Sequence, residues 1–315
     1  MGIPGMKNLF STKSSKNVGP LCFVILGMAA LFFVIQPRFF SLTNLTNVGR
    51  QASVLAIVSC GQLFVVLVGC IDLSVGSLIG VTSVVTTLAL LEFGFFPGFI
   101  LGLMTGVVLG GVNGAIVSYL RIPPMIATLA MLYFAKGAAL TITGGMPVER
   151  LPRTFGILGK GSALGIPIPM LVAALTFGIC YFVLAKVSTG RNIYAIGGSE
   201  ETSRLAGIAV RRYKMFAYIV SGLMAALGSV ILSSRMTLGQ PILGEGIEFE
   251  SIAAVVVGGA RLGGGKGTIP GTILGVIFLA ILGNGLNLSR VSSFTQMIVV
   301  GSVLVAAVVV DRWRG

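Results

Sequence analysis

The sequence contains no histidine and few charged residues. Asp, Glu, Lys and Arg make up only 10% of its 315 residues, whereas a soluble globular protein has about 25%. Because 55% of the residues are hydrophobic, the chain cannot cover its surface with polar groups, and lipid must be part of its solvent. The absence of histidine removes the usual general base and the usual zinc ligand. Together with the lack of paired buried carboxylates, it argues against an intramembrane hydrolase.

Acidic residues are scarce as well: nine Asp and Glu stand against 22 Lys and Arg, for a net charge of +13. The basic residues are dispersed between apolar runs and form no single face, so no nucleic-acid partner is expected. Membrane proteins collect such residues in cytoplasmic loops. The four cysteines have spacings that fit neither a metal site nor a disulfide framework, and we interpret them as small buried hydrophobic residues. They are Cys22, Cys60, Cys70 and Cys180.

One glycine-rich segment, Gly263–Thr268, invites comparison with a phosphate-binding loop. That motif needs a glycine separated by four residues from a Gly-Lys-Ser/Thr ending. Here Ala260 replaces the first glycine, and Gly267 intervenes between Lys266 and Thr268. We therefore expect this chain to bind no cofactor. If ATP drives its activity, ATP and Mg²⁺ bind to a partner ATPase.

Ten stretches are apolar and close to the roughly 20 residues that cross a bilayer as a helix. Only Ile71–Leu73 separates the second from the third, and Gly258–Gly259 interrupts the eighth. Gln36–Arg38 follow the first stretch in place of a cleavage site, so we expect it to be retained. The pattern predicts an all-α polytopic membrane protein of about ten transmembrane helices, a single domain over residues 1–315 with a cytosolic tail at 1–19. The stretches lie near residues 20–36, 51–70, 74–91, 95–119, 122–143, 168–186, 215–233, 249–262, 268–287 and 294–310.

The distribution of charge predicts the orientation. With ten spans and a cytosolic N-terminus, fourteen Lys and Arg fall in inside segments and seven in outside segments, in agreement with the positive-inside rule. Both termini and the long polar loop at 187–214 are then cytosolic, and the chain is a multi-pass protein of the cytoplasmic (inner) membrane. The acidic residues that we place outside are Glu92, Glu149, Glu245, Glu248 and Glu250.

The loop at 187–214 contains signals for a short helix. Ser199 is suited to cap it, and Glu200 and Glu201 would occupy the first turn, where carboxylates favour the positive end of a helix. Gly207 is placed to end it. A helix of about two turns is not stable alone in water, so its apolar edge must pack on its own membrane domain or dock onto a partner; a solvated interfacial helix is the alternative. That edge consists of Leu205, Ala206 and Ile208.

Glycine, at 45 residues, recurs at intervals of four in two predicted spans. Without Cβ atoms, such faces let helix backbones approach closely. We interpret them as packing faces within the subunit, and faces that slide during gating are the alternative. The glycines are Gly102, Gly106, Gly110 and Gly114 in the fourth span and Gly267, Gly271 and Gly275 in the ninth.

Six polar residues in or beside apolar stretches are candidates for a substrate pathway. Asp72 would be costly at membrane depth, where carboxylates are usually functional or paired. We favour the alternative that Asp72 or Ser74 caps the third span. Lys136 either contacts substrate or extends to the outer interface. The remaining three are amides that suit a neutral polyol or a bond between helices: Asn284, Asn287 and Gln296.

A faint internal repeat is also present. Val68-Gly69-x-x-Asp72-Leu73-x-x-Gly76 matches Val257-Gly258-x-x-Arg261-Leu262-x-x-Gly265 at identical spacing. Transporters often carry repeats with broken helices near the substrate path. On the predicted topology both copies face the cytosol, which does not fit a simple inverted repeat, and four shared residues in glycine-rich sequence also arise by chance.

Several motifs together resemble those of ABC importer permeases of the ribose type, which take up ribose, xylose, arabinose, galactose, autoinducer-2 and related polyols. The motif in the polar loop is Gly190-Arg191-x-x-Tyr194-Ala195-x-Gly197-Gly198, followed by Glu200 and Gly207-Ile208. The matches run through most of the chain. The others are Ile71–Ser77, Ile126–Leu129, Lys136–Gly137, Ala253–Gly259, Gly264–Gly267 and Asn284–Leu288.

The resemblance implies partners and a coupling site. Two permeases would form the pore, most simply as a homodimer, with two ATP-binding domains below and a periplasmic or extracellular sugar-binding protein above. Ser199 stands where the family often has Asn, Glu201-Thr202 where it often has Ala-Ala, and Lys136 where it more often has Arg. The first two departures could re-tune docking to a particular ATPase. The implied coupling residues are Gly197, Gly198, Ser199, Glu200, Thr202, Arg204, Leu205 and Gly207.

We therefore expect a translocation subunit without catalytic residues, which moves a sugar or related small polyol across the cytoplasmic membrane while a partner hydrolyses ATP. The alternative is a secondary transporter of about ten spans driven by an ion gradient. That mechanism needs a membrane-embedded acid or proton relay, and Asp72 is the only candidate.

Overall fold

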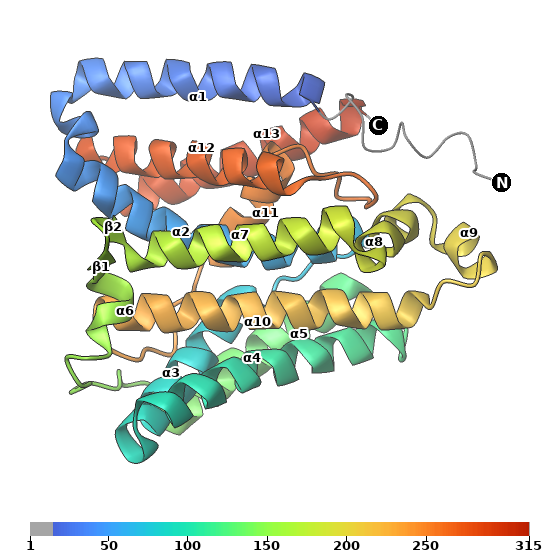
Figure 1. Cartoon of the computed structure of the whole chain (residues 1–315), viewed down its shortest axis with the longest axis horizontal. Helices are drawn as coiled ribbons and strands as arrows, with labels where there is room; N and C mark the ends of the chain where they lie inside the picture. The colour runs from blue at the N-terminus through green and yellow to red at the C-terminus, as the bar shows by residue number, and fades with distance from the viewer. Residues whose placement is uncertain (1–14, 315) are drawn as a thin grey trace.

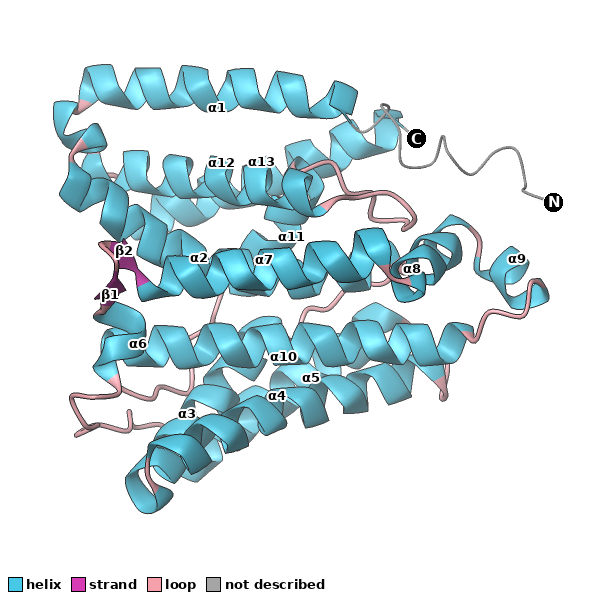
Figure 2. Ribbon diagram, viewed as in Figure 1, coloured by secondary structure: helices cyan, strands magenta, loops and turns pink. Residues whose placement is uncertain are grey.

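The computed structural model describes residues 15–314, and in that part of the chain almost all regular structure is helical (Figures 1 and 2). The only strands described form a two-residue hairpin, with Ser162 opposite Pro167. The elements in chain order are α1 (Ser15–Ile35), η2 (Pro37–Phe40), α2 (Leu42–Leu67), α3 (Val75–Phe93), α4 (Phe95–Ser118), α5 (Pro124–Thr143), α6 (Gly156–Lys160), β1 (Ser162–Ala163), β2 (Ile166–Pro167), α7 (Ile168–Lys186), α8 (Ser188–Gly198), α9 (Glu200–Leu205), α10 (Val210–Met236), α11 (Ile247–Val257), α12 (Ile269–Leu288) and α13 (Ser293–Arg314).

Seven of the described helices are long and apolar enough to cross a membrane: α2, α3, α4, α5, α7, α10 and α12. Helices α1 and α13 contain shorter apolar runs. The structure thus bears out a polytopic helical membrane protein and does not confirm the count of ten spans. Most of the expected tail at 1–19 lies outside the described residues, and α1 begins within it at Ser15.

The eighth predicted span, 249–262, is wrong as a transmembrane helix. Helix α11 has 11 residues, about 16 Å at the usual rise, or roughly half of the hydrocarbon core. It ends at Val257, because Gly258 and Gly259 close the helix and Gly259 adopts φ +90°.

Helix α2 lies at the centre of the bundle and is buried on every side from Ser53 to Leu67. Its neighbours include α7, α10, α11 and α12. A helix that is apolar over its whole circumference is expected in the core of a large helical protein. Figure 1 shows α7 and α10 running side by side along the bundle, with α4 next to α10.

The glycine face of the fourth span is a packing face, as predicted. A Cβ on Gly106 would meet the carbonyl oxygen of Gly222 in α10, and a Cβ on Gly110 would meet that of Tyr218. Gly102 lies against Thr86 of α3, and Gly114 against Met215 of α10. Helices α4 and α10 therefore approach backbone to backbone between Gly106 and Gly114 of α4.

The glycines of the ninth span also serve close packing. Gly271 and Gly275 of α12 lie against backbone atoms of Gly258 and Ala254 near the end of α11. Gly267 precedes α12 and adopts φ +154° beneath Ala260. Sliding of these faces during gating stays a prediction.

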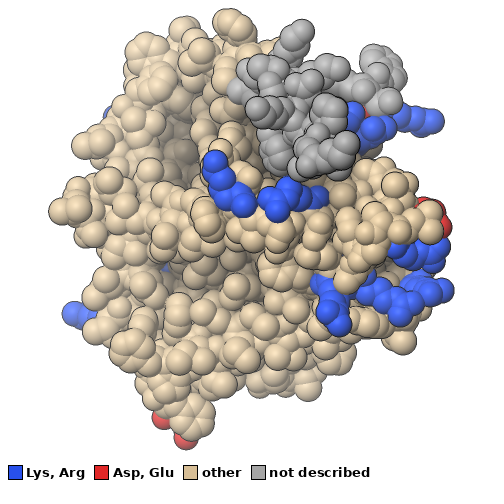
Figure 3. All heavy atoms as spheres, turned by 45° about the vertical axis from the view of Figure 1, so that its right-hand side comes forward, with Lys and Arg blue, Asp and Glu red and all other residues tan. Residues whose placement is uncertain are grey.

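Basic residues gather at one end of the bundle, which carries α8 and α9 and lies at the right in Figure 1. Figure 3, turned toward that end, shows Lys and Arg side chains on the surface with few acidic ones between them. The described residues there include Lys186 at the end of α7 and Arg191 in α8. This is the end that the charge distribution predicts to be cytosolic.

Candidate functional site

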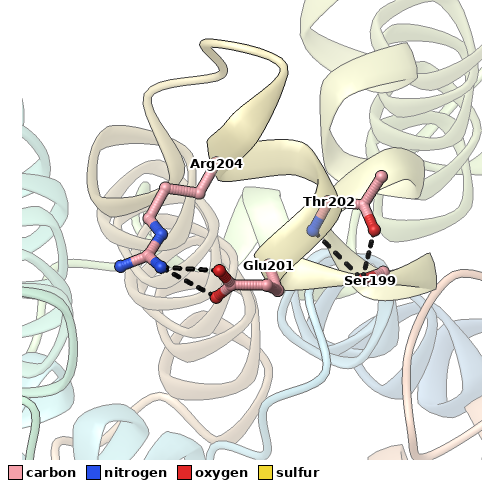
Figure 4. Close-up of polar contacts among 4 residues, drawn as sticks. All are labelled: Ser199, Glu201, Thr202 and Arg204. Atoms are coloured by element: carbon pink, nitrogen blue, oxygen red, sulfur yellow. Dashed lines mark hydrogen bonds and ion pairs between the residues drawn. The ribbon is translucent and has the colours of Figure 1, made fainter.

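The short helix predicted in the polar loop is present as α9. The Ser199 hydroxyl accepts a hydrogen bond from the Thr202 amide at 3.2 Å and donates one to Thr202 Oγ1 at 2.9 Å (Figure 4). Arg204 pairs with Glu201 at 2.7 Å on the exposed side. Gly207 adopts φ +80° just after the helix, which only glycine does at little cost.

Helix α9 projects from the bundle, and Figures 1 and 2 show it as the outermost element at its end. Leu205 is 78% exposed, and Ala206 is exposed too. Of the predicted apolar edge, Ile208 alone packs against the core. An ion pair between Glu200 and Lys214 connects α9 to α10. The exposed apolar residues Leu205 and Ala206 are therefore free to contact another molecule.

Helix α8 connects α9 to the bundle and lies where the sequence pattern predicts only a polar loop. Ile193 and Ile196 are buried in the core, three residues apart on one face. The Tyr194 hydroxyl donates to the carbonyl of Gly267 at 2.8 Å. Burial raises the pKa of Tyr194 to about 12, so the hydroxyl stays a donor. The i, i+3 spacing of the isoleucines was the available signal for this helix.

Gly197 and Gly198, both predicted to serve coupling, differ in their surroundings. Gly197 lies against the carbonyl oxygen of Leu67 and the backbone of Gly264 and Gly265, whereas Gly198 faces open space. The Gly265 amide donates to the same Leu67 carbonyl at 3.0 Å. The end of α2, the end of α8 and the loop after α11 therefore meet backbone to backbone.

The ends of α2 and α11 have the same hydrogen-bond pattern. The Cys70 amide bonds to the Val65 carbonyl, and the Ala260 amide bonds to the Val255 carbonyl. In both, the preceding glycine, Gly69 or Gly259, has a positive φ. By hydrogen bonds and backbone angles, Gly69 is therefore equivalent to Gly259. The faint sequence repeat instead aligns Gly69 with Gly258, which is one residue earlier. The sequence match therefore does not follow the structural equivalence of the two helix ends.

The carboxylate of Asp72 is completely buried before α3. Oδ1 accepts hydrogen bonds from the Ser74 amide at 2.9 Å and the Ser74 hydroxyl at 2.6 Å, and Oδ2 accepts one from Ser221 of α10 at 2.8 Å. Asn113 of α4 donates to the Ser74 hydroxyl at 2.8 Å. The preferred cap interpretation needs correction, because Ser74 makes no side-chain cap and Asp72 binds the amide of Ser74 rather than those of α3. The carboxylate instead joins three segments.

A non-helical segment made largely of successive turns connects α10 to α11 and packs against α3. It starts at Gly239, packed on Thr87 of α3, and reaches Gly244, packed on Gly76. Those contacts are 11 residues apart on α3, or about 16 Å along a helix. With no water in a bilayer core, non-helical backbone is tolerated only where protein buries it or where it lines an aqueous cavity. The segment and α11 together make one traverse of the bundle.

Lys136 contacts the non-helical segment before α11. Its Nζ lies 2.5 Å from Oε1 of Glu245, and both side chains are about half exposed, at 40% and 51%. Glu248, in the first turn of α11, is buried and accepts a hydrogen bond from the Gly246 amide. The sequence prediction assigned Glu245 and Glu248 to an outside segment and gave neither a place in the substrate pathway; the structure places Glu245 just before α11 beside Lys136 and Glu248 in the first turn of α11. The sequence does not reveal Glu245 and Glu248 as neighbours of Lys136, because hydrophobic periodicity carries no signal for a non-helical segment that packs inside the bundle.

The three candidate amides have other surroundings. Asn284 of α12 forms a reciprocal amide pair with Asn44 of α2, at 2.9 and 3.0 Å, which is the interhelical alternative. Gln296 donates to the carbonyl of Val291 at the start of α13. Asn287 is exposed. None of the three lies in the Lys136–Glu245 group.

These features define the class: a polytopic helical membrane protein with a half-length helix in its core and a capped helix projecting from its basic end. Comparison with known proteins identifies the family. Residues 44–308 match the family described as the branched-chain amino acid transport system / permease component, and the chain belongs to it. No solved structure shows a significant match.

Similar curated proteins carry the names of sugar permeases. The chain is 40% identical over 293 residues to the ribose import permease protein RbsC of Escherichia coli K12, with 91% of each chain covered. It is 39% identical to RbsC of Bacillus subtilis, over 94% of this chain and 93% of that protein. It is 38% identical to the L-arabinose transport system permease protein AraH of E. coli K12, over 93% and 89%.

Proposed function

We propose that the chain is the translocation subunit of an ATP-driven importer that carries a monosaccharide across the cytoplasmic membrane. The observation that supports this most directly is the near full-length similarity to ribose and arabinose permeases. Although the family description names branched-chain amino acids, the curated relatives described above, which match over about nine-tenths of the chain, are named for sugars. The chain contributes the pathway and no catalytic residue.

Helix α9 is the proposed coupling element. Its cap at Ser199 and its exposed Leu205 give a short ordered helix with an apolar side chain at the basic end of the molecule, suited to a groove on an ATPase subunit that binds ATP and Mg²⁺. The contact of Gly197 with Leu67 connects this end to the central helix α2. A displacement of α8 and α9 would therefore reach the core directly. We place the end of the bundle that carries α8 and α9 in the cytosol, together with both chain termini.

The proposed substrate pathway passes the Lys136–Glu245 pair. Discontinuous helices in transporters commonly lie beside the substrate, and charged side chains in the membrane face a cavity or a partner rather than lipid. Ammonium and carboxylate groups can bond the hydroxyls of a sugar. Both side chains are half exposed in the single chain, which fits a pathway completed by a second copy. A periplasmic or extracellular binding protein would deliver the sugar.

Reconstitution tests the function. The chain is placed in proteoliposomes with its ATPase subunit and binding protein, and uptake of radiolabelled ribose, arabinose and leucine is measured with and without internal ATP. We expect sugar uptake that requires ATP and survives ionophores. Uptake that is independent of ATP and collapses with an ionophore would establish the ion-gradient alternative.

The coupling role has a separate test. Glu200→Lys combined with Leu205→Asp should abolish ATP-dependent uptake while the thermal unfolding temperature stays within about 2 °C, because exposed substitutions usually change stability by less than about 0.5 kcal/mol. The control is Glu149→Lys with Leu164→Asp, an exposed pair in the segment between α5 and β2. Normal uptake by the first variant would show that α9 is only a topological anchor.

A further inference from the structure

A basic cavity of about 330 Å³ lies between the α4–α5 turn and the start of α10. Its walls include Arg121 from the turn, Arg204 from α9, and Arg211 and Lys214 from α10; Glu200 is its one acidic residue. The lining thus carries a formal excess of three positive charges. None of these four cations belongs to the Lys136–Glu245 group.

The cations have few acidic partners inside the cavity. Lys214 is largely buried, with 16% of its side chain exposed, and pairs with Glu200. Arg204 pairs with Glu201, which is not part of the lining. Within the described residues, no acidic group pairs with Arg121 or Arg211. Several guanidinium groups facing one concavity repel each other unless an anion joins them.

A polar group in the wall also lacks a partner. Ser118, the last residue of α4, lines the cavity and is only 5% exposed. Its hydroxyl makes no hydrogen bond within the described residues. A buried hydroxyl is stabilised by a hydrogen-bond partner, which an anion bound in this cavity would supply.

Two helix starts complete the lining. Helix α5 begins at Pro124 and α10 at Val210, and neither has a side-chain cap. Both residues line the cavity. The positive ends of two long helices, of 20 and 27 residues, therefore add to the field of the arginines.

We propose that this cavity binds a phosphate group. A phosphate offers several acceptor oxygens, enough for the Ser118 hydroxyl and for two guanidinium groups at once, whereas a protein carboxylate has only two oxygens. The phosphate comes either from an anionic lipid headgroup, since basic pockets between transmembrane helices bind such headgroups, or from a soluble phosphate ester. The cavity shares Glu200 and Arg204 with the proposed coupling helix, so phosphate binding is measured on the chain without substrate or ATPase.

The experiment uses the purified full-length chain in detergent. Native mass spectrometry counts bound phosphatidylglycerol and, separately, phosphatidylcholine, and equilibrium dialysis measures radiolabelled inorganic phosphate. We expect one retained phosphatidylglycerol, or one phosphate, per chain, with an affinity at least tenfold lower in Arg121→Gln/Arg211→Gln. Binding of phosphatidylglycerol alone identifies a lipid site, and binding of phosphate as well identifies a site for soluble esters.

The control is Arg150→Gln/Arg153→Gln, which removes the same charge from the exposed segment after α5 and should bind like the unmodified chain. Ser118→Ala should lower affinity three- to tenfold, since it removes the specific donor. Affinity that falls with the arginines but not with Ser118→Ala would indicate diffuse attraction and overturn the site. Absence of binding to either probe, with loss of ATPase affinity in the arginine variant, would instead make the cavity a protein contact.

Discussion

The α-carbon of Gly197 in α8 lies against the carbonyl oxygen of Leu67 at the end of α2, so closely that a methyl group has no room. That carbonyl also accepts the amide of Gly265. The contact joins the element that projects from the membrane domain to the helix at its centre. Because the three segments meet through backbone, no flexible side chain can absorb a displacement between them.

Gly197→Ala should therefore destabilise the protein by about 1–3 kcal/mol, the usual cost of forcing extra atoms into a packed site, and reduce coupled uptake. Stability is measured with a thiol-reactive dye that reports exposure of the buried Cys60, Cys70 and Cys180. Gly198→Ala is the matched control, since nothing lies within 4 Å of a Cβ there. Equal melting temperatures for the two variants would contradict the contact.

Asp72 should prove structural rather than proton-carrying. Asp72→Ala leaves three donors at Ser74 and Ser221 without an acceptor and should cost at least about 3 kcal/mol, from a penalty of roughly 1–3 kcal/mol for each buried unpaired group. Asp72→Asn keeps one acceptor oxygen and should retain most of the ATP-dependent uptake. A folded Asp72→Asn variant without uptake would favour the ion-gradient mechanism.

The Lys136–Glu245 pair should matter for transport and little for stability. An ion pair with both partners about half exposed contributes about 0–1 kcal/mol, so Lys136→Ala and Glu245→Ala should shift the melting temperature only slightly. We expect uptake to fall at least tenfold in each, measured in proteoliposomes at fixed ATP. Glu92→Ala removes another exposed acid and serves as the control. Uptake unchanged in both variants would remove the pair from the pathway.

The close contact of α4 with α10 should be intolerant of any side chain. A Cβ on Gly222 meets the carbonyl of Gly106, so Gly222→Ala should destabilise the protein by about 1–3 kcal/mol. Gly178→Ala in α7 has open space around the new methyl group and should be neutral or slightly stabilising, because alanine favours a helix more than glycine does. The dye assay compares the two.

The sequence alone shows that lipid surrounds much of this protein and that it is a polytopic helical membrane protein. Apolar stretches near 20 residues predict membrane helices whatever packs against them, and Gly102, Gly106 and Gly110 predict a packing face, since backbone approach needs only the absence of Cβ atoms. Ser199 and Gly207 predict a short helix because caps act over three or four residues. These are local properties, which a single chain segment carries by itself.

Tertiary structure decided what depends on distant partners. Only the fold shows that residues 239–244 pack along α3, that Glu245 meets Lys136 across 109 positions of sequence, and that Asp72 joins α10 through Ser221. The helical character of residues 188–198 is likewise fixed by packing of Ile193 and Ile196 on the core. Side-chain pairs of this kind follow from helix arrangement in three dimensions, for which one-dimensional periodicity carries no signal.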